Sequence, residues 1–324
     1  MDVTVVGAGV AGLSTALALE QRGHRVRIVA RAQGGAITSA LAGAVWFPYH
    51  AGPPDKVASW AARTRAWLEQ LAVRTPDAGV DVLTGYEITR DASDPWWAAA
   101  VPIASEGTLA SSAAEGRRGS IERVPAPVAG APAAWKFVAP RAEPALFLPW
   151  LAAQLRARVE YGEIAALADV PGDAVVNCTG LAARELAGDP QLTPLLGQTL
   201  ICAPGGVDLA VSITDARDDD AIFYVIPRRT ELVVGGCAID VPPGTEPRVD
   251  PAITQRILAH ARALGLPLGP LRAERVGLRP ARREVRLERD PRDPRIVHNY
   301  GHGGAGFTLC HGCAEDVAAL VEDA

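Results

Sequence analysis

The chain has 324 residues, of which 48% are hydrophobic and 21% charged, enough to bury one large core or two moderate ones, and two domains are expected. A net charge of −5, with dispersed basic residues, gives no electrostatic reason to expect nucleic acid or an anionic membrane as a partner. No apolar run reaches the length of a membrane span and the first motif begins at residue 7, so we expect a cytoplasmic protein without a signal peptide.

The N-terminal segment predicts a strand, a glycine turn and a helix. β-Branched residues at positions 3–6 run into Gly7-Ala8-Gly9-Val10-Ala11-Gly12, and an alanine- and leucine-rich segment follows. At this spacing Gly7 allows a sharp turn, Gly9 leaves room for a pyrophosphate, and Gly12 lets the helix pack close to the strand. The helix N-terminus then faces the phosphates. We therefore predict a dinucleotide site here, with a helix-packing turn that binds no ligand as the alternative.

A second strand at residues 24–30 ends at Arg31. An acid that binds the adenosine ribose is usual about 20 residues after the glycines, and this chain offers a cation at the end of the strand instead. Arg31 could favour a 2′-phosphate or could be solvated. The N-terminus alone therefore leaves FAD and NADP open.

The middle of the chain alternates helical and strand-like segments. A loop of small residues at 34–44 leads to the aromatic stretch 45–49, which fits a pocket wall and a core contact equally well. Helices are predicted at 55–75, 145–158 and 253–264 and a buried strand at 173–180. Four segments predict an antiparallel sheet: 200–202, 209–213, 223–227 and 231–236. The charged residues 215–220, between the second and third of these segments, favour a solvated turn over a pocket lid.

Five cysteines are too few and too uneven for a disulfide framework, so reduced thiols are expected. The pair Cys310 and Cys313 has a metal or redox spacing, but no second pair completes a four-ligand zinc site, and no metal is predicted. A disulfide between Cys202 and Cys237 is left open.

The C-terminal part has two further motifs. Residues 276–282 place Arg279 directly before a proline, and residues 298–308 predict a second glycine-rich loop that enters a helix running through Val321. Taken alone, Arg279 would more often be a surface ion-pair member, and Tyr224 in its strand would be half-buried packing.

Taken in order, these motifs resemble the D-amino-acid oxidase family of FAD-dependent enzymes. The resemblance spans nearly the whole chain and rests on residues 5–13, 45–49, 94–97, 176–180, 224–227, 277–282 and 298–304. It implies an α/β fold with a Rossmann-like FAD-binding domain at 1–54, 144–198 and 275–324. It also implies an interleaved α+β substrate-binding domain, built on a mainly antiparallel sheet, at 55–143 and 199–274.

The resemblance implies a role for three groups at the substrate. Arg279 is expected to bind the substrate carboxylate through its planar fork, the Tyr224 hydroxyl to donate to the same carboxylate, and the Gly304 carbonyl to accept from the amine. His298 and His302 then lie in the flavin loop and transfer no proton. The residues expected to bind FAD are Gly7, Ala8, Gly9, Val10, Ala11, Gly12, Arg31, Thr38, Ser39, Gly43, Ala44, Val45, Thr179, Gly180, Gly303, Gly304, Ala305, Gly306, Phe307 and Thr308.

The reaction that the resemblance implies is oxidative deamination of a D-amino acid, by hydride transfer from Cα to flavin N5, to a 2-oxo acid, ammonia and hydrogen peroxide. Arg217 resembles one of the arginines to which D-aspartate oxidases owe their dicarboxylate preference, but Ala238 occupies the place of the other, so neutral substrates are expected to be preferred. The acidic residues 218–220 leave basic substrates open as well. The alternatives are a D-aspartate oxidase or a glycine or sarcosine oxidase. The expected partners are a small D-amino acid and dioxygen, with no nucleic acid and no membrane; a homodimer is left open.

Overall fold

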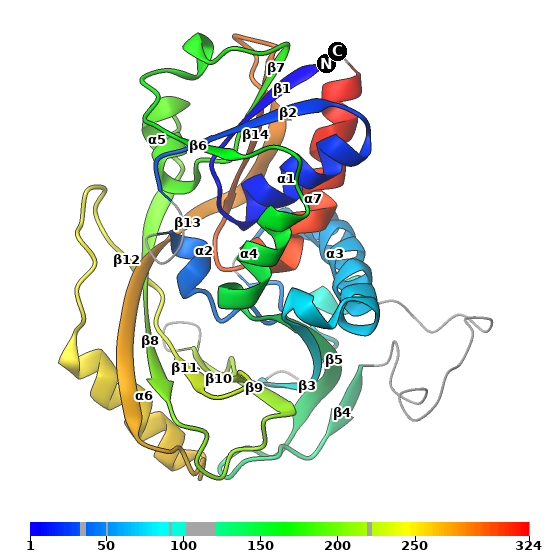
Figure 1. The fold of residues 1–324 in the computed structure, drawn as a ribbon. Helices are drawn as coiled ribbons and strands as arrows, with labels where there is room; N and C mark the ends of the chain where they lie inside the picture. Colours follow the sequence, from blue (N-terminus) through cyan, green and yellow to red (C-terminus); the bar gives the residue numbers. More distant parts are fainter. Residues whose placement is uncertain (33–36, 50, 91–92, 102–120, 219–221, 324) are drawn as a thin grey trace.

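A single twisted sheet runs the length of the molecule in this computed structural model (Figure 1). The structure describes residues 1–32, 37–49, 51–90, 93–101, 121–218 and 222–323. Within them the sheet has 14 strands, in the order β4-β5-β3-β9-β10-β11-β8-β13-β14-β7-β1-β2-β6, with β12 paired to β8. The described part of the chain contains no helix that is long and apolar enough to cross a membrane.

The parallel half of the sheet consists of five strands. Within this half each strand is parallel to its neighbours, and the central strands are buried on both faces, as their runs of valine require. In sheet order the five strands are β6 (Val159–Tyr161), β2 (Arg25–Ala30), β1 (Asp2–Val6), β7 (Ala174–Asn177) and β14 (Ile296–His302).

Helices cover both faces of the parallel half. On one face, the apolar sides of α1 (Val10–Gln21), α4 (Pro144–Ala153) and α7 (Gly306–Glu322) form one core cluster with β1 and β7. On the other face, a smaller cluster packs α5 (Ala183–Leu186) against β7 and β14. The arrangement is the doubly wound one predicted from the glycine turn.

The antiparallel half contains the other strands. Its pairs are antiparallel except β3 with β9, which run parallel. The outer face packs on α6 (Pro251–Ala263), and the short α2 (Thr38–Leu41) lies near β13 on the inner face. In sheet order these strands are β4 (Glu122–Val124), β5 (Ala134–Ala142), β3 (Val80–Ile88), β9 (Val211–Asp215), β10 (Phe223–Pro227), β11 (Leu232–Gly235), β8 (Thr193–Cys202) and β13 (Leu271–Arg289), with β12 (Ile239–Asp240) beside β8.

Two predicted segments differ from the structure. The helix expected to continue to residue 158 ends at Ala153, because the Glu20 carboxylate accepts hydrogen bonds from the backbone nitrogens of Arg156 (2.8 Å) and Ala157 (2.7 Å) and holds them out of the helix. Residues 298–302, expected in a loop, are the end of buried β14. The prediction failed there because polar residues are unusual in a central strand. They are tolerated here because each side chain has a partner inside the protein, as the contacts of His298 with Asn177 and Asp290 show.

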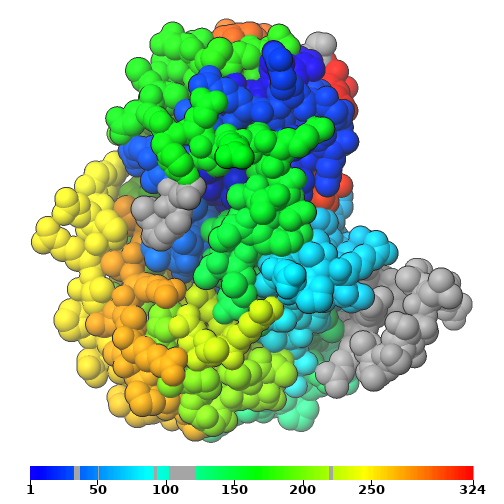
Figure 2. Space-filling view, viewed as in Figure 1, coloured from blue at the N-terminus to red at the C-terminus, as the bar shows by residue number. Residues whose placement is uncertain are grey.

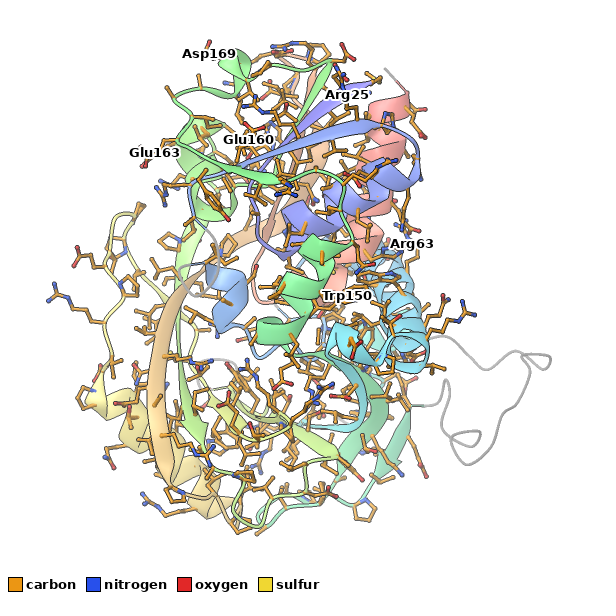
Figure 3. All side chains as sticks on the ribbon, viewed as in Figure 1. Arg25, Arg63, Trp150, Glu160, Glu163 and Asp169 are labelled. Atoms are coloured by element: carbon orange, nitrogen blue, oxygen red, sulfur yellow. The ribbon has the colours of Figure 1, made fainter. Side chains whose placement is uncertain are left out.

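The two halves share elements across the predicted domain boundaries. β8 runs through residues 198 and 199, and β13 runs through residues 274 and 275. Helix α3 (Pro54–Arg74), predicted to be substrate-domain structure, packs on α7: Gly312 N donates to Thr64 Oγ1 (3.0 Å), and Arg63, labelled in Figure 3, donates to Asp316 (2.7 Å). The division into domains at residues 54, 143, 198 and 274 stays a prediction.

Candidate functional site

The glycine turn between β1 and α1 is built by close backbone contacts. Gly7 has a φ of +115°, and a Cβ added to it would stand 2.3 Å from the carbonyl oxygen of Cys178, the residue after β7. A Cβ on Gly12 would stand 1.9 Å from the carbonyl oxygen of Gly7. These two glycines therefore bring α1 against the ends of β1 and β7, as the sequence predicted.

Gly9 is different because a side chain there would meet no backbone atom. Its backbone is extended, and a Cβ there would have one near neighbour, the Ser39 Oγ at 3.1 Å. That hydroxyl accepts a hydrogen bond from Val10 N (3.1 Å), at the start of α1. The N-terminus of this 12-residue helix thus opens onto the cavity described next, as a phosphate site requires.

A cavity of about 900 Å³ extends from this turn to the inner face of the antiparallel half. Helix α2 contributes Thr38, Ser39 and Leu41 to its lining and reaches the surface between β13 and α4 (Figure 2). The volume lies in the range of small-molecule and cofactor sites. One continuous space therefore joins the predicted dinucleotide turn to the predicted substrate residues.

Nearly all of the predicted site residues line this cavity. Gly12 does not, since it acts in packing, and Ala305 does not, since it is buried beneath the turn that precedes α7. The predicted residues that line it are Gly7, Ala8, Gly9, Val10, Ala11, Arg31, Thr38, Ser39, Gly43, Ala44, Val45, Thr179, Gly180, Tyr224, Arg279, Gly303, Gly304, Gly306, Phe307 and Thr308.

The cavity floor is a row of residues that face each other across neighbouring strands. Thr214 lies opposite Tyr224, Tyr224 opposite Gly235, Gly235 opposite Thr199, and Thr199 opposite Arg275. A Cβ on Gly235 would stand 2.3 Å from the Tyr224 ring, so the ring lies flat over β11. The small residues beside Tyr224 leave the space above the floor open.

Arg279 reaches over the floor from β13. A Cβ on Gly197 of β8 would stand 2.4 Å from the Arg279 guanidinium carbon, so this glycine makes room for the side chain. Arg279 Nη1 donates to the carbonyl oxygen of Cys237 (2.9 Å). Burial raises the pKa of Tyr224 while its hydrogen bond and charge interaction with Arg279 oppose the rise, so the Tyr224 hydroxyl keeps its proton at neutral pH.

The turn that carries Gly304 is tied to the same strand. Gly303 N donates to the carbonyl oxygen of Pro280, the residue after Arg279, at 2.9 Å. Gly304 itself packs under Tyr49, whose ring would meet a Cβ on Gly304 at 2.6 Å. The backbone of the turn is thereby fixed relative to Arg279.

The two histidines of β14 do not lie together at the cavity, since His302 lines it and His298 does not. His298 is fully buried, lies 3.0 Å from Asp290 Oδ2 through its Nε2, and contacts the Asn177 side chain (3.3 Å). Burial lowers the pKa of His298 and lowers that of His302 to about 4. Both pKa values therefore lie below the ordinary value for histidine, and the expectation that these residues transfer no proton stays a prediction.

The arginine that resembled a dicarboxylate ligand points away from the cavity. Arg217 donates to both oxygens of the Asp215 carboxylate (2.8 and 2.6 Å) and to the carbonyl oxygen of Gly130 (2.7 Å). Each of its three side-chain nitrogens thus bonds to the protein, and it is absent from the lining. The acidic residues 219 and 220, the glycines 34 and 35 and the histidine at position 50 lie outside the described residues.

A buried carboxyl group lies one strand beyond the lining. Glu87 faces Thr214 on β9, and its Oε2 accepts from Trp97 Nε1 at 2.9 Å. Burial raises the pKa of Glu87 from its usual value near 4.5 to about 7, although the hydrogen bond from Trp97 opposes the rise.

We expect this carboxyl group to make folding stability depend on pH. Because its pKa is higher in the folded than in the unfolded state, the free energy of unfolding should fall as pH rises from about 4.5 to about 7. Glu87→Gln should remove this part of the fall and raise the stability at pH 8, relative to pH 4.5, by up to roughly 3 kcal/mol. Urea unfolding at both pH values checks this, and an equal change at both would contradict it.

The loop that carries Ala44 is held from two sides. Arg228 is buried and donates to the carbonyl oxygen of Ala42 (2.8 Å), while Ala142 N of β5 donates to the carbonyl oxygen of Ala44 (2.9 Å). Ala44 has a φ of +59°, the left-handed conformation that L residues other than glycine avoid.

Replacement of Ala44 by glycine should relieve this conformation. We expect Ala44→Gly to stabilise the FAD-free protein by about 0.5–1 kcal/mol, the left-handed penalty less the larger unfolded-state entropy of glycine. Ala44→Val should destabilise it, because β-branching makes the left-handed conformation worse. Thermal unfolding of the three proteins gives the order; a glycine variant that melts below the parent would show that this backbone is not strained.

Sequence reasoning missed several lining residues. Thr199, Thr214 and Arg275 lie on the floor, and Glu163, just beyond β6 and labelled in Figure 3, lies in the parallel half. Strand alternation could have placed Arg275 on the same face as Arg279, since the two are four residues apart on one strand. The places of Thr199 and Thr214 on the floor depend on how the strands pair, and nothing in the sequence around either threonine indicated a site.

The five cysteines lie in the core. All are buried and free, so Cys202 and Cys237 form no disulfide in this structure. Burial raises the pKa of Cys178 to about 12 and that of Cys310 to about 11, which leaves both as inert thiols. The five cysteines therefore contribute to packing of the core.

The donor set fits FAD. A glycine turn with an open position at Gly9, an exposed helix N-terminus and a cavity long enough to reach a second glycine turn at Gly303 match the three parts of a dinucleotide flavin: adenosine, pyrophosphate and ring. Arg31 lines the cavity beyond β2, where the ribose-binding acid is missing.

Comparison with known proteins gives one family along the whole chain. The DAO model, described as FAD dependent oxidoreductase, matches residues 2–320. The chain is 42% identical to a D-amino-acid oxidase from Rubrobacter xylanophilus, over 98% of this chain and 94% of that protein. It is 39% identical to one from Streptomyces coelicolor, over 98% of this chain and 96% of that protein.

Two other similarities correspond to the alternatives. A D-aspartate oxidase from Homo sapiens is 30% identical over 99% of this chain and 94% of that protein. A crystal structure of glycine oxidase from Geobacillus kaustophilus has a TM-score of 0.76 at 20% identity and covers 99% of this chain and 94% of that one, which shows a common fold.

Proposed function

Because the chain belongs to the DAO family of FAD-dependent oxidoreductases, we propose that it is an FAD-dependent oxidase of D-amino acids. The observation that carries the proposal is that Arg279 and Tyr224 interact on the floor of the cavity that begins at the glycine turn. In this reading residues 1–54, 144–198 and 275–324 form the FAD-binding domain, and the other two segments bind substrate.

Three groups of the chain hold the amino acid. The Arg279 guanidinium binds the carboxylate, for which its planar fork is suited, and the Tyr224 hydroxyl donates to the same carboxylate. The Gly304 carbonyl accepts from the amine. The amine binds in its uncharged form. When hydride leaves Cα, the nitrogen lone pair forms the C=N bond and a cationic imine results. No described side chain of the floor therefore has to act as a base.

The chemistry supplied by FAD when bound is acceptance of that hydride at flavin N5 and return of the electrons to dioxygen, with hydrogen peroxide as product. The imine takes up water and yields the 2-oxo acid and ammonia. The chain contributes by positioning the substrate. Because its carboxylate and amine are both held, the Cα–H bond keeps a fixed orientation toward flavin N5. For FAD itself, we propose contacts from the lining residues named above, with Ser39 and the α1 N-terminus at the pyrophosphate.

Neutral D-amino acids are the proposed preference. Arg217 is occupied by Asp215, and Ala238 offers no charge, so neither position supplies a second carboxylate ligand. This distinguishes the chain from the D-aspartate oxidase reading. The glycine or sarcosine oxidase reading has the same fold and is separated by comparing oxidation of glycine and D-alanine.

The decisive experiment is a spectrum of the purified protein. We expect yellow protein whose flavin bands bleach with D-alanine but not with L-alanine under nitrogen, and recover with peroxide formation when air is admitted. Gel filtration tests the homodimer, and the cytoplasmic location stays a prediction. Protein that takes up no FAD, or bleaches with glycine and not with D-alanine, would reject the proposal.

A further inference from the structure

One arginine on the cavity floor has no partner among the residues that the structure describes. Arg275 of β13 is half-buried and lines the cavity, yet among the described residues it makes no hydrogen bond or ion pair. The other guanidinium groups nearby are used: Arg279 donates to the Cys237 carbonyl, and Arg228 donates to Glu231 and to the Ala42 carbonyl. A partly desolvated cation of this kind favours an anion from outside the protein.

The floor places Arg275 close to the end of the Tyr224 ring. The ring covers Gly235, so only Thr199 separates it from Arg275 in the row. Arg275 also shares its strand face with Arg279, with Gly277 between, so their Cα atoms are roughly 13 Å apart. The Arg279 guanidinium lies over Gly197, and the next residue on that face of β8 is Thr199, opposite Arg275. A ligand held by Arg279 can therefore extend over Thr199 toward Arg275.

The charges around the floor leave Arg275 uncompensated. The acids in the lining are Glu163 and Glu185, and both belong to the parallel half. Glu87 stands in the same row beyond Thr214 but is not in the lining, and it is bonded to Trp97. A bound amino acid brings one carboxylate, which compensates Arg279 alone.

We propose that Arg275 binds the side-chain carboxylate of longer acidic substrates, so that D-glutamate is oxidised in preference to D-aspartate. The proposal rests on the proposed function and refines its substrate class. Neutral side chains leave Arg275 to solvent and remain good substrates. The extra methylene of D-glutamate matters because the two arginines are held apart by Gly277, and a charge-assisted bond forms only if the second carboxylate reaches the fork.

The test compares two arginines of one strand. Arg275→Gln removes the charge from the floor, while Arg272→Gln removes the same charge from an exposed residue of β13 whose Nη1 contacts the Thr230 carbonyl outside the lining. We expect Arg275→Gln to lower kcat/KM for D-glutamate by roughly 10- to 100-fold, the worth of a charge-assisted hydrogen bond, and that for D-alanine less than twofold. Arg272→Gln should change neither.

A binding measurement separates this inference from the proposed function. Glutarate should perturb the flavin spectrum of the parent holoenzyme, or raise its melting temperature, at lower concentration than butyrate, and Arg275→Gln should remove the difference. Arg275→Lys, which keeps the charge, should retain part of it. The inference fails if parent enzyme binds both ligands equally, or if Arg275→Gln lowers D-alanine and D-glutamate turnover alike. If no D-amino acid reduces the flavin, the proposed function fails, and glutarate binding still reports on Arg275.

Discussion

Arg279→Ala is expected to lower kcat/KM for D-alanine by roughly 10²- to 10³-fold, mainly through a higher KM. Removal of one partner from a buried, hydrogen-bonded charge pair typically costs that much, and the substrate carboxylate would lose its bidentate ligand. The variant should still bind FAD, because Arg279 lies over the antiparallel half of the floor and away from the glycine turn. Steady-state kinetics with a check of flavin content measures the effect.

Arg279→Lys is the matched control for this result. It retains the charge and loses the fork, so its kcat/KM should fall between those of the parent and the alanine variant. The second control, Arg272→Ala on the same strand, should behave as the parent does. An alanine variant with parental kinetics would remove Arg279 from the substrate site, and one without flavin would show that its role is structural.

Gly9→Ala is expected to abolish tight FAD binding while leaving the FAD-free protein folded. The backbone at Gly9 is extended, which alanine adopts freely, and the new methyl group meets only the Ser39 hydroxyl, at 3.1 Å. It would stand where the pyrophosphate has to approach the backbone. We expect a loss of roughly 100-fold or more in FAD affinity, measured by quenching of FAD fluorescence, with the melting temperature of the apoprotein nearly unchanged.

Gly12→Ala provides the contrast. Its methyl group would stand 1.9 Å from the Gly7 carbonyl oxygen, a contact with backbone that α1 can relieve only by moving. An alanine within a helix normally stabilises it by about 1 kcal/mol, so a lower melting temperature for Gly12→Ala would mark the clash. If Gly9→Ala instead melted early and Gly12→Ala merely lost FAD, the assignment of the two glycines would be reversed.

The sequence predicted the parts of the fold that depend on local chemistry. The glycine turn, most helices and the strands of the antiparallel half follow from residue type and periodicity, because each is decided within a few residues. The prediction failed where distant groups decide the outcome. Glu20 ends a helix more than 130 residues away in sequence, and the polar end of β14 is stable only because His298 and Asn299 find buried partners.

The site was predictable to a similar extent. Arg279 and Tyr224 carried weak signals alone and gained meaning only from the order of motifs along the chain. Their contact with each other, the room that Gly197 gives to Arg279 and the unpartnered state of Arg275 depend on strand register, which no local pattern reveals. For Arg217 the motif was misleading. Its position resembled that of an arginine that binds a second substrate carboxylate, but its hydrogen bonds to Asp215 hold it away from the cavity.

The hydrogen bond between Gly303 N and the Pro280 carbonyl affects which enantiomer of the substrate can react. Pro280 follows the residue proposed to grip the carboxylate, and Gly303 precedes the one proposed to accept from the amine. If the carboxylate and the amine of the substrate are held at a fixed distance, the two enantiomers differ in the places of the Cα hydrogen and the side chain, which are exchanged. Only one enantiomer can then present its hydrogen to the ring and its side chain to the open floor, so chiral discrimination would follow from a single main-chain contact.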